Sequence, residues 1–330
     1  MIDFIEAIKY GCKDSPNLTH CKPFQCKLNK FGWNTYGLKG CDEIQVHYKP
    51  ESGGLRIKGS LPYFIQGHNF SFSREGFVEC VEVLQNLLGV GLWDAEVAEF
   101  EYGTIFPVEV QPSLLIRNHY APSGSHLVQD EKGKDKGSFR WWTDSDKVLK
   151  MYDAGKNVKQ KLRPKERDVL AGCGYNPDKN YIKFEVHYKK PERITGRVIT
   201  LEDLQSTEFV KILNNDIVRK YQELRPMRTL KPQTDKKKLS ALDIVVSAFV
   251  EEEMNQGVPM EGVKRKVYRY ANSAGCLTTP DKDARKATIR RAFGRLAESE
   301  SSSWDLTEML QRSLDADAGQ GKDQMREDLK

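Results

Sequence analysis

Long apolar runs are missing from this chain of 330 residues. No segment approaches the ~20 consecutive apolar residues that a membrane-spanning helix needs. The first four residues carry an acid, Asp3, and no basic flank of the kind that opens a secretory signal. We therefore expect a cytoplasmic protein that has no membrane partner.

Closely spaced metal-ligand pairs are missing as well. Four of the seven cysteines lie within the first 41 residues, near His20 and His47, but no two cysteines have the two-residue spacing of a zinc knuckle. None of the six histidines is two residues from another. Two interpretations of the cysteines remain: a structural zinc site, or reduced and partly buried thiols. The spacing favours the thiols.

Charge is abundant but unevenly distributed. The net charge is +5, and residues 299–330 carry four basic and eight acidic side chains, so the other 298 residues hold +9. A basic body with an acidic tail is typical of proteins that handle DNA, although solubility explains it equally well. With 38% hydrophobic residues, the chain can still build a packed core.

Alternating apolar and polar residues dominate the first 110 positions and predict a β-β-α-β order with antiparallel pairing. Residues 74–88 have helical spacing instead, and Ser73 is a suitable N-cap. Residues 147–161 begin as a strand and turn helical, whereas residues 121–138 are polar and glycine-rich like a loop. The other expected elements are strands at residues 37–49, 54–72, 95–105 and 180–189 and an amphipathic helix at residues 201–221.

The C-terminal third differs in character. Residues 226–238 contain two prolines, several lysines and no apolar periodicity, which predicts a linker. It would join an α+β domain with a mainly antiparallel sheet and flanking helices, residues 1–225, to a small basic helical domain, residues 239–298. Helices are expected at residues 239–254, 260–273 and 281–297, and residues 299–330 are expected to be a disordered acidic tail apart from a short helix around residues 306–314.

Gln66 and His68 belong to the segment "FIQGHNFSF". On a strand they would project from one face, where an imidazole and an amide oxygen can bind a divalent cation. Glu99 and Glu101 share one face of the expected strand at residues 95–105 and can add carboxylates. The alternatives are a polar turn whose side chains satisfy backbone groups, and a solvated acidic face.

Tyr152 and Lys156 belong to the segment "VLKMYDAGKNVKQK". A phenol that attacks a phosphodiester needs a nearby positive group, and a lysine four residues later lies on the same side of a helix. The alternative is a tyrosine that packs its ring and points its hydroxyl to water.

Lysines crowd this region, and Trp141 and Trp142 precede them. Lysines neutralise phosphates, and exposed aromatic rings stack on unpaired bases. A solvated lysine-rich helix above a buried tryptophan pair fits equally well. The DNA-binding candidates are Lys150, Lys159, Lys161, Arg290 and Arg291.

Taken together, these segments resemble the gene II/X family of filamentous-phage replication initiators, which is related to the rolling-circle HUH endonucleases. The resemblance covers about residues 1–225 and follows the family's order. "IKGSLPYFIQGHNFSF" resembles its Q-G-H-N segment, "AEVAEFEYG" its acidic strand, "VLKMYDAGKNVKQK" its tyrosine segment and "YIKFEVHYKK" the F-E strand that follows.

The resemblance implies an HUH-like enzyme that nicks the plus-strand origin of circular phage DNA in the cytoplasm of a bacterial host. Tyr152 would become linked to the 5′-phosphate with help from Lys156, leaving a 3′-hydroxyl, and the displaced strand would later be rejoined. His68, Gln66, Glu99 and Glu101 would hold Mg²⁺ or Mn²⁺. Origin DNA would be the main partner, with a host helicase and polymerase as further partners.

Two positions depart from the family pattern. Gln66 stands where the HUH relatives have a histidine, and Glu99 stands where this family usually has an aspartate. Glu185 matches the glutamate of the F-E strand, for which an architectural role is also open. The rival hypothesis is a non-catalytic, sequence-specific DNA-binding regulator in which the basic C-terminal helices read the groove.

Overall fold

The computed structural model describes residues 1–12, 14–23, 32–117, 119–120, 126–129, 139–162, 167, 170–173, 175–226, 230–232, 245–246, 249–250, 253, 260–275, 277–278, 280–294, 296–298 and 305–316. The chain divides into two compact units. The first comprises residues 1–116, 126–222 and 307–330, and the second comprises residues 117–125 and 223–306. The chain enters the second unit first at residue 117 and again at residue 223, so neither unit is one continuous segment.

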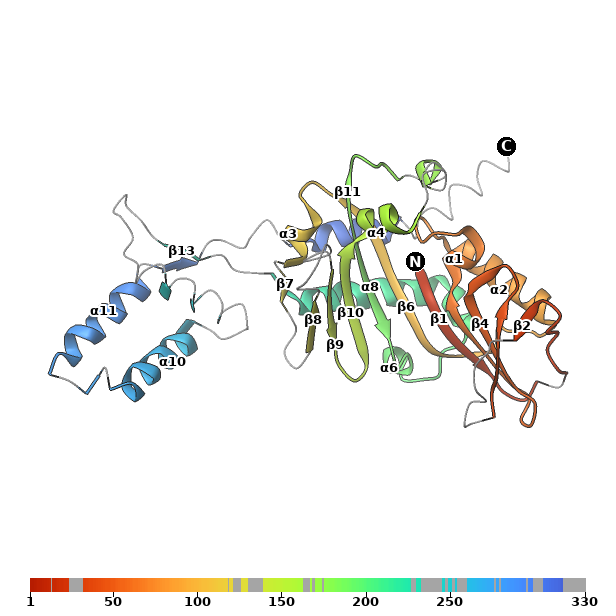
Figure 1. Ribbon diagram of the computed structural model, residues 1–330, viewed down its shortest axis with the longest axis horizontal. Helices are drawn as coiled ribbons and strands as arrows, with labels where there is room; N and C mark the ends of the chain where they lie inside the picture. Colours follow the sequence, from red (N-terminus) through yellow and green to blue (C-terminus); the bar gives the residue numbers. More distant parts are fainter. Residues whose placement is uncertain are drawn as a thin grey trace. The chain divides into compact units, whose positions relative to one another are not determined.

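A ten-stranded antiparallel sheet forms the first unit, in the order β2-β3-β4-β5-β1-β6-β11-β10-β9-β8 (Figure 1). This confirms the predicted mixture of helices with a mainly antiparallel sheet. Its strands are β1 (Ile2–Lys9), β2 (Cys21–Pro23), β3 (Asn34–Leu38), β4 (Cys41–Lys49), β5 (Gly54–Ser60), β6 (Glu96–Val108), β8 (His126–Gln129), β9 (Phe139–Thr143), β10 (Lys147–Asp153) and β11 (Asn180–Tyr188).

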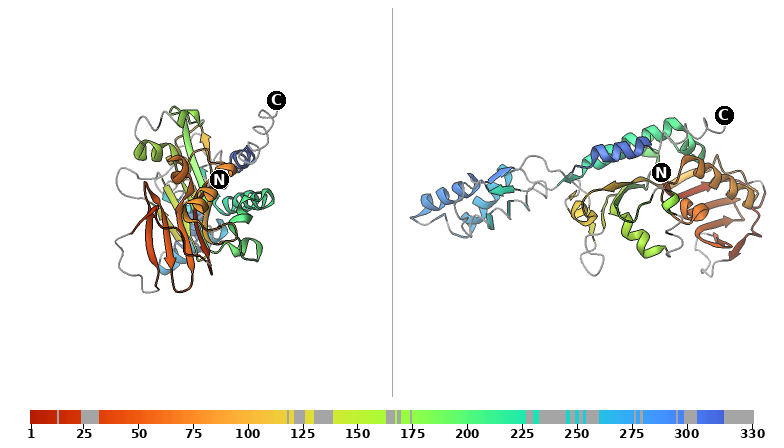
Figure 2. Two further views of the ribbon diagram at one scale, coloured as in Figure 1. Left: turned by 90° about the vertical axis from the view of Figure 1, so that its right-hand side faces the viewer. Right: turned by 90° about the horizontal axis from the view of Figure 1, so that it is seen from above.

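The two faces of the central strands have different roles. On one face, Phe184 of β11 packs edge-on against Tyr221, and Tyr188 donates a hydrogen bond to Asp216, both on helix α8 (Thr207–Glu223). Residues 307–316 form a helix beside α8 on this face, where Ser313 contacts Thr104 of β6 (Figure 2, right). Because side chains alternate along a strand, the neighbouring residues point to the other face.

Two helices of the first unit begin directly after an N-cap residue. Helix α2 (Arg74–Leu88) is capped as predicted, because Ser73 accepts a hydrogen bond from the backbone N–H of Gly76. Strand β10 contains Tyr152 and ends at Asp153, which caps α4 (Ala154–Lys161), and this confirms the predicted change from strand to helix. Other helices among the described residues are α1 (Leu61–Gln66), α3 (Pro112–Arg117), α6 (Glu192–Thr195) and α7 (Leu201–Gln205).

Two predicted elements were wrong in detail. The expected strand through residues 54–72 ends at Ser60, because Pro62 favours the first turn of a helix and Gly67 adopts the left-handed conformation that ends it. The single helix expected at residues 201–221 is interrupted at Ser206. The loop expected at residues 121–138 lies largely outside the described residues, apart from β8.

The second unit contains α10 (Met260–Ser273) and α11 (Lys282–Gly294), which confirms two of its predicted helices. Val250, Val263 and Phe293 form its small core. Its short strands are β7 (His119–Tyr120), which pairs with β12 (Arg225–Pro226), and β13 (Leu230–Pro232), which pairs with β14 (Leu296–Glu298). The helix predicted at residues 239–254 lies mostly outside the described residues.

Among the described residues, no helix combines the length and apolar character needed to cross a bilayer.

Candidate active site

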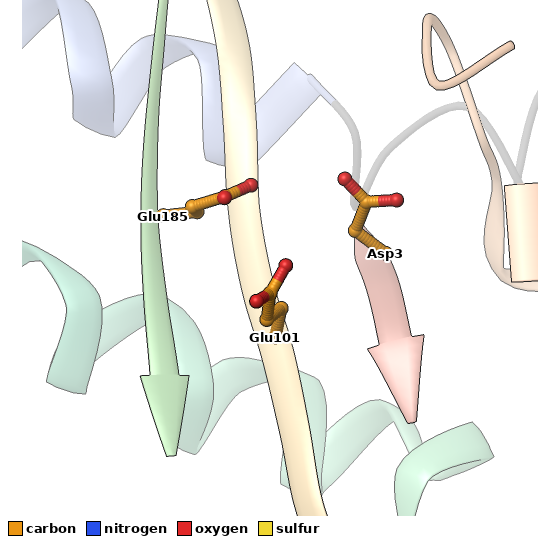
Figure 3. Close-up of side chains that lie close together, drawn as sticks. All are labelled: Asp3, Glu101 and Glu185. Atoms are coloured by element: carbon orange, nitrogen blue, oxygen red, sulfur yellow. The ribbon is translucent and has the colours of Figure 1, made fainter. Parts of the chain in front are cut away.

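Three acids from three neighbouring strands converge on the face of the sheet opposite α8. Asp3 of β1, Glu101 of β6 and Glu185 of β11 each offer a carboxylate oxygen within 4.8 Å of the others (Figure 3). Asp3 and Glu185 are buried, and Glu101 is half-buried. A buried triad of this kind can hold a metal ion.

A β-bulge explains how Asp3 joins the triad. Between Ile2, which lies opposite Tyr102, and Ile5, which lies opposite Phe100, β1 contains one more residue than β6. The extra residue lets both Asp3 and Phe4 face the acids, and Phe4 stacks on His187 with ring centroids 5.6 Å apart.

Two lysines already neutralise part of the triad. Lys183 is fully buried; its Nζ contacts Asp3 and lies 2.7 Å from Glu185. Lys150 contacts Glu101 and lies 3.5 Å from Glu185, above the ring of Trp141. Three carboxylates and two ammonium groups leave a net charge of −1, so a divalent cation would make the cluster positive and suited to a phosphate.

His187 links the triad to a fourth acid. Its Nδ1 lies 2.8 Å from Glu101 and its Nε2 lies 3.0 Å from Glu99. Glu99 is therefore one step removed from the triad, on its exposed side. Within the described residues, the group of possible metal ligands contains Glu101 but not Glu99.

The surroundings shift the pKa values of the acids in opposite directions. Burial alone would raise the pKa of Glu101, but the hydrogen bond from His187 and the charge of Lys150 outweigh it and lower the pKa to about 2. Burial raises the pKa of Glu185, and Lys183 offsets this only in part. Glu101 is thus strongly ionised, and Glu185 accepts a proton more readily than Glu101 does.

Tyr152 stands beside this cluster. It lies on β10 opposite Lys183, and its hydroxyl donates to Glu185 Oε2 at 3.4 Å. Lys183 lies 5.8 Å from the centre of its ring. Burial and the charge of Glu185 hold the pKa of the phenol well above its ordinary value, while Lys183 lowers it.

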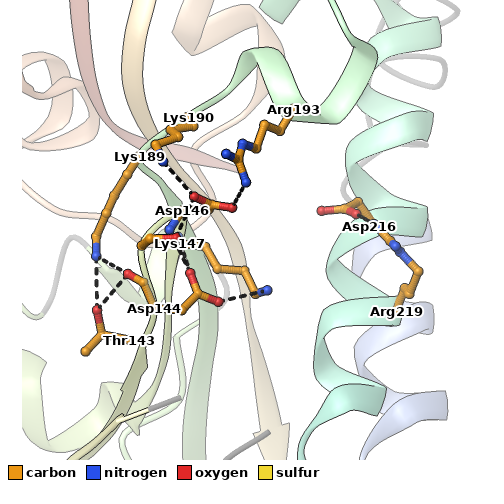
Figure 4. Close-up of polar contacts among 10 residues, drawn as sticks. Thr143, Asp144, Asp146, Lys147, Lys189, Lys190, Arg193, Asp216 and Arg219 are labelled. Atoms are coloured by element: carbon orange, nitrogen blue, oxygen red, sulfur yellow. Dashed lines mark hydrogen bonds and ion pairs between the residues drawn. The ribbon is translucent and has the colours of Figure 1, made fainter. Parts of the chain in front are cut away.

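A polar network at the start of β10 fixes this register (Figure 4). In the β9–β10 turn, Asp144 accepts hydrogen bonds from the backbone N–H groups of Asp146 and Lys147, each at 2.8 Å. Lys189, directly after β11, donates to Thr143 at 3.0 Å and to the Asp144 carbonyl at 2.7 Å. The network clamps β10 to β11, which places Lys150 opposite Glu185.

Lys156 does not share a helical face with Tyr152, so the spacing argument for this pair was wrong. Tyr152 belongs to the strand, whereas Lys156 lies in the first turn of α4. The backbone N–H of Lys156 donates a hydrogen bond to the side chain of Asp153. The spacing of four residues aligns side chains only when both lie within one helix.

Gln66 and His68 are not brought to the acids as ligands. Because Gln66 ends α1, the two residues do not lie on one strand face, and the Gln66 amide donates to the carbonyls of His68 and Phe70. His68 Nδ1 accepts the backbone N–H of Phe70, which leaves Nε2 to carry the proton toward Cys173, 4.0 Å away. The arrangement matches the polar-turn alternative. Asn69 is the residue of this segment that contacts the triad, at 3.3 Å from Asp3.

The predicted DNA contacts fall into three groups. Lys150 is engaged by the acids rather than presented on the surface. Lys159 is exposed on α4, and Arg290 and Arg291 are exposed on α11. The side chain of Lys161 lies outside the described residues. Among the described cysteines, Cys21 is a buried free thiol, and Cys12 and Cys41 are half-buried free thiols.

Sequence reasoning missed Asp3 and Lys183 as site residues. Asp3 lacks a motif and reaches the triad only through the bulge. Lys183 had a signal, because it stands two residues before Glu185 and so shares its strand face.

Comparison with known proteins adds no relative from which a role could be transferred. The sequence matches no protein-family model and has no significant match among curated proteins.

Proposed function

We propose that this protein is a DNA nicking and joining endonuclease of the rolling-circle replication type, in which Tyr152 is the nucleophile. The observation that carries the proposal is the contact between the Tyr152 hydroxyl and Glu185, a member of a carboxylate triad that can hold a metal ion. A phenol, a cation site and buried lysines are the groups that tyrosine-mediated phosphoryl transfer requires.

The ligand set favours Mg²⁺ or Mn²⁺. All three candidate ligands are carboxylates, and hard divalent cations prefer oxygen ligands. When bound, such a cation would polarise the scissile phosphate and neutralise charge that develops on it. It would also oppose the charge of Glu185, which adds to the effect of burial in raising the pKa of Tyr152.

The residues around Tyr152 can accept its phenolic proton and stabilise the negative charge of the phenolate. As the bond between Tyr152 Oη and phosphorus forms and the P–O3′ bond breaks, the phenolic proton passes to Glu185, which already accepts that hydrogen bond. Lys183 stabilises the phenolate, and the leaving 3′-oxygen takes a proton from water. The products are a 5′-phosphotyrosine link and a free 3′-hydroxyl, and no nucleotide is consumed.

Single-stranded DNA, or a duplex opened locally, is the proposed substrate. Trp141 is 40% exposed beside Lys150, so an unpaired base can stack on it near the site. Lys159 on α4 adds an exposed positive charge to the same unit.

A covalent-adduct assay tests the proposal. The protein is incubated with a fluorescent pool of random-sequence single-stranded oligonucleotides, with Mg²⁺, Mn²⁺ or EDTA, and analysed on denaturing gels. We expect an SDS-resistant adduct only when a divalent cation is present. Peptide mapping of that adduct should find the DNA attached to Tyr152. Tyr152→Phe should lower the yield about tenfold or more, because a phenyl ring cannot attack.

Tyr175→Phe is the matched control. Tyr175 is a buried tyrosine of the same unit whose hydroxyl has no hydrogen-bond partner among the described residues, so its loss should change neither stability nor adduct yield. If the wild-type chain forms no adduct with any cation, the proposal is wrong.

The rival proposal, a DNA-binding regulator without catalysis, is supported by α11. Arg290 and Arg291 project from this helix into solvent, as a helix that contacts DNA phosphates would require. A protein that shifts duplex DNA in a gel but never forms a covalent adduct would favour this rival.

A further inference from the structure

The QGHN segment, residues 66–69, reaches the triad through Asn69 but takes no part in the nicking step described above. The side chain of Asn69 is buried, and its amide nitrogen donates to Asp3 Oδ2 at 3.3 Å. Gln66 and His68, the predicted ligands, make other hydrogen bonds. The contact between the segment and the triad is therefore one buried amide.

Three hydrogen bonds fix the backbone on both sides of Asn69. The Gln66 amide donates to the carbonyl of His68 at 3.0 Å and to the carbonyl of Phe70 at 2.9 Å. His68 Nδ1 accepts the backbone N–H of Phe70 at 3.3 Å. Because the residues before and after Asn69 are both held, its side chain is kept directed at Asp3.

The chain leaves this segment through a strained residue. Ser71 has a φ of 50°, and no other non-glycine residue among those described has a positive φ. Its hydroxyl donates to the carbonyl of Cys173 at 2.8 Å, which fastens the end of the turn. Strain of this kind persists only where the surrounding structure holds the backbone in place, and it is concentrated at functional sites.

Ser60 holds the other oxygen of the same carboxylate. It occupies the N-cap position of α1, where a serine side chain ordinarily accepts a hydrogen bond from a backbone N–H of the first turn. Ser60 makes no such bond and donates to Asp3 Oδ1 at 3.0 Å. The helix lacks its usual cap, and Asp3 gains a second neutral donor.

Neutral donors act on Asp3 differently from the lysine beside it. Lys183 cancels one negative charge of the triad, whereas the Ser60 hydroxyl and the Asn69 amide leave the charge available to a cation. Hydrogen bonds to both oxygens also restrict rotation of the carboxylate. Removal of a group that holds a metal ligand in this way typically weakens metal binding about 10- to 100-fold.

We propose that Asn69 is a positioning residue of the metal site, which acts with Ser60 to hold the Asp3 carboxylate in the orientation that binds a divalent cation. Gln66 and His68 contribute indirectly, because they fix the backbone around Asn69. The inference rests on the cation site of the nicking function proposed above. It gives the QGHN segment a role other than metal ligation.

A titration with Mn²⁺, followed by electron paramagnetic resonance of the free ion, tests the inference on wild type, Asn69→Ala and Ser60→Ala. We expect each substitution to weaken Mn²⁺ binding about tenfold or more, because the carboxylate of Asp3 is then free to rotate. Binding should still saturate at higher Mn²⁺ concentrations, since all three carboxylates remain. Urea denaturation checks that each variant is folded, and if Asn69→Ala does not fold, Ser60→Ala decides.

Asn214→Ala is the matched control. Asn214 is also a buried asparagine of the first unit, but it lies on α8, where it accepts a hydrogen bond from Tyr102 and donates to the carbonyl of Leu314. Its loss should lower the urea midpoint and leave the affinity for Mn²⁺ within about twofold of the wild type. A buried amide that is lost away from Asp3 should thus affect stability alone.

The adduct assay provides a second readout that separates positioning from general damage. With limiting Mn²⁺, Asn69→Ala should form less adduct than the wild type does. With saturating Mn²⁺, its yield should return to within about twofold of the wild type, because the cation then occupies the site. A yield that stays low at every Mn²⁺ concentration would contradict a role in cation binding.

The outcomes distinguish this inference from the proposed function. If Asn69→Ala binds Mn²⁺ as tightly as the wild type, the inference is wrong and the nicking function stands. If Asn69→Ala weakens Mn²⁺ binding but the wild type forms no adduct with DNA, the nicking function is wrong and Asn69 still positions Asp3. A wild type that binds no Mn²⁺ would overturn both.

Discussion

At the scale of single residues, the buried charge of Lys183 is the central feature. Its ammonium group has no access to water and lies between Asp3 and Glu185. Burial disfavours a charged lysine, but the two carboxylates outweigh this and raise the pKa of Lys183 well above its ordinary value. Lys183 therefore stays charged, and its ammonium group neutralises part of the carboxylate charge that a bound cation would also neutralise.

Lys183→Met should cost about 3–5 kcal/mol in the free energy of unfolding, because it leaves two buried carboxylates without their partner. Urea denaturation measures the loss. Added Mn²⁺ should recover more stability in this variant than in the wild type, since the cation replaces the missing charge.

Lys190→Met is the matched control. Lys190 also pairs with an acid, Asp146, but its side chain is 40% exposed. Its loss should cost less than about 1 kcal/mol. Equal costs for the two variants would contradict the role given to burial at Lys183.

At the scale of elements, the close approach of β6 and β11 depends on Gly103. This glycine lies opposite Glu185, and a Cβ atom added to it would meet Glu185 Cβ at 2.4 Å and the carbonyl oxygen of Phe184 at 2.4 Å. Neither atom belongs to the flexible end of a side chain, so the strands would have to separate. Glu101 and Glu185 would then move apart.

Gly103→Ala should therefore destabilise the protein by about 1–3 kcal/mol in urea denaturation and weaken divalent-cation binding. Gly172→Ala is the control, because an added Cβ there meets no atom within 4 Å. It should be neutral or stabilising by up to about 1 kcal/mol, since Gly172 is helical and exposed. A harmless Gly103→Ala would contradict the tight strand contact.

The elements also explain what the sequence could predict. Period-two alternation was enough to place Glu101 on a strand, and the change from strand to helix after Tyr152 was recognisable. The place of Asp3 in the triad was not predictable, because a bulge depends on how β1 pairs with a strand almost a hundred residues away. The prediction that Gln66 and His68 share a strand face required alternation to continue through residue 68. The segment that begins at Leu61 and Pro62 folds as a helix instead.

At the scale of the whole molecule, acid should weaken the first unit through Glu101. Its pKa is lowered in the folded protein from 4.5 to about 2, so its ionised form contributes stability that is fully present above pH 4.5. That contribution should disappear as the pH falls from 4.5 to about 2. Glu185 acts in the opposite sense, because burial raises its pKa.

Urea midpoints measured across this pH range test the assignment. Glu101→Gln removes the titrating group, so the variant should lose stability at neutral pH and show a shallower decline toward low pH than the wild type. Parallel curves for the two proteins would show that Glu101 does not contribute.

The second unit should contribute to DNA affinity without affecting chemistry. Replacing both Arg290 and Arg291 by alanine should reduce the slope of log affinity for duplex DNA against log salt by about 2, because each phosphate contact contributes about 0.9. Fluorescence anisotropy at several salt concentrations measures the slope. Adduct formation with single-stranded oligonucleotides should be unaffected, and an unchanged slope would remove α11 from the DNA-binding surface.

Titration with Mn²⁺, followed by electron paramagnetic resonance of the free ion, tests the central claim most directly. We predict that the wild type binds a Mn²⁺ ion which Asp3→Asn and Glu101→Gln each fail to bind, while His68→Ala and Glu99→Gln retain it. If Asp3→Asn binds Mn²⁺ as the wild type does, or if His68→Ala abolishes binding, the triad of Asp3, Glu101 and Glu185 is not the metal site.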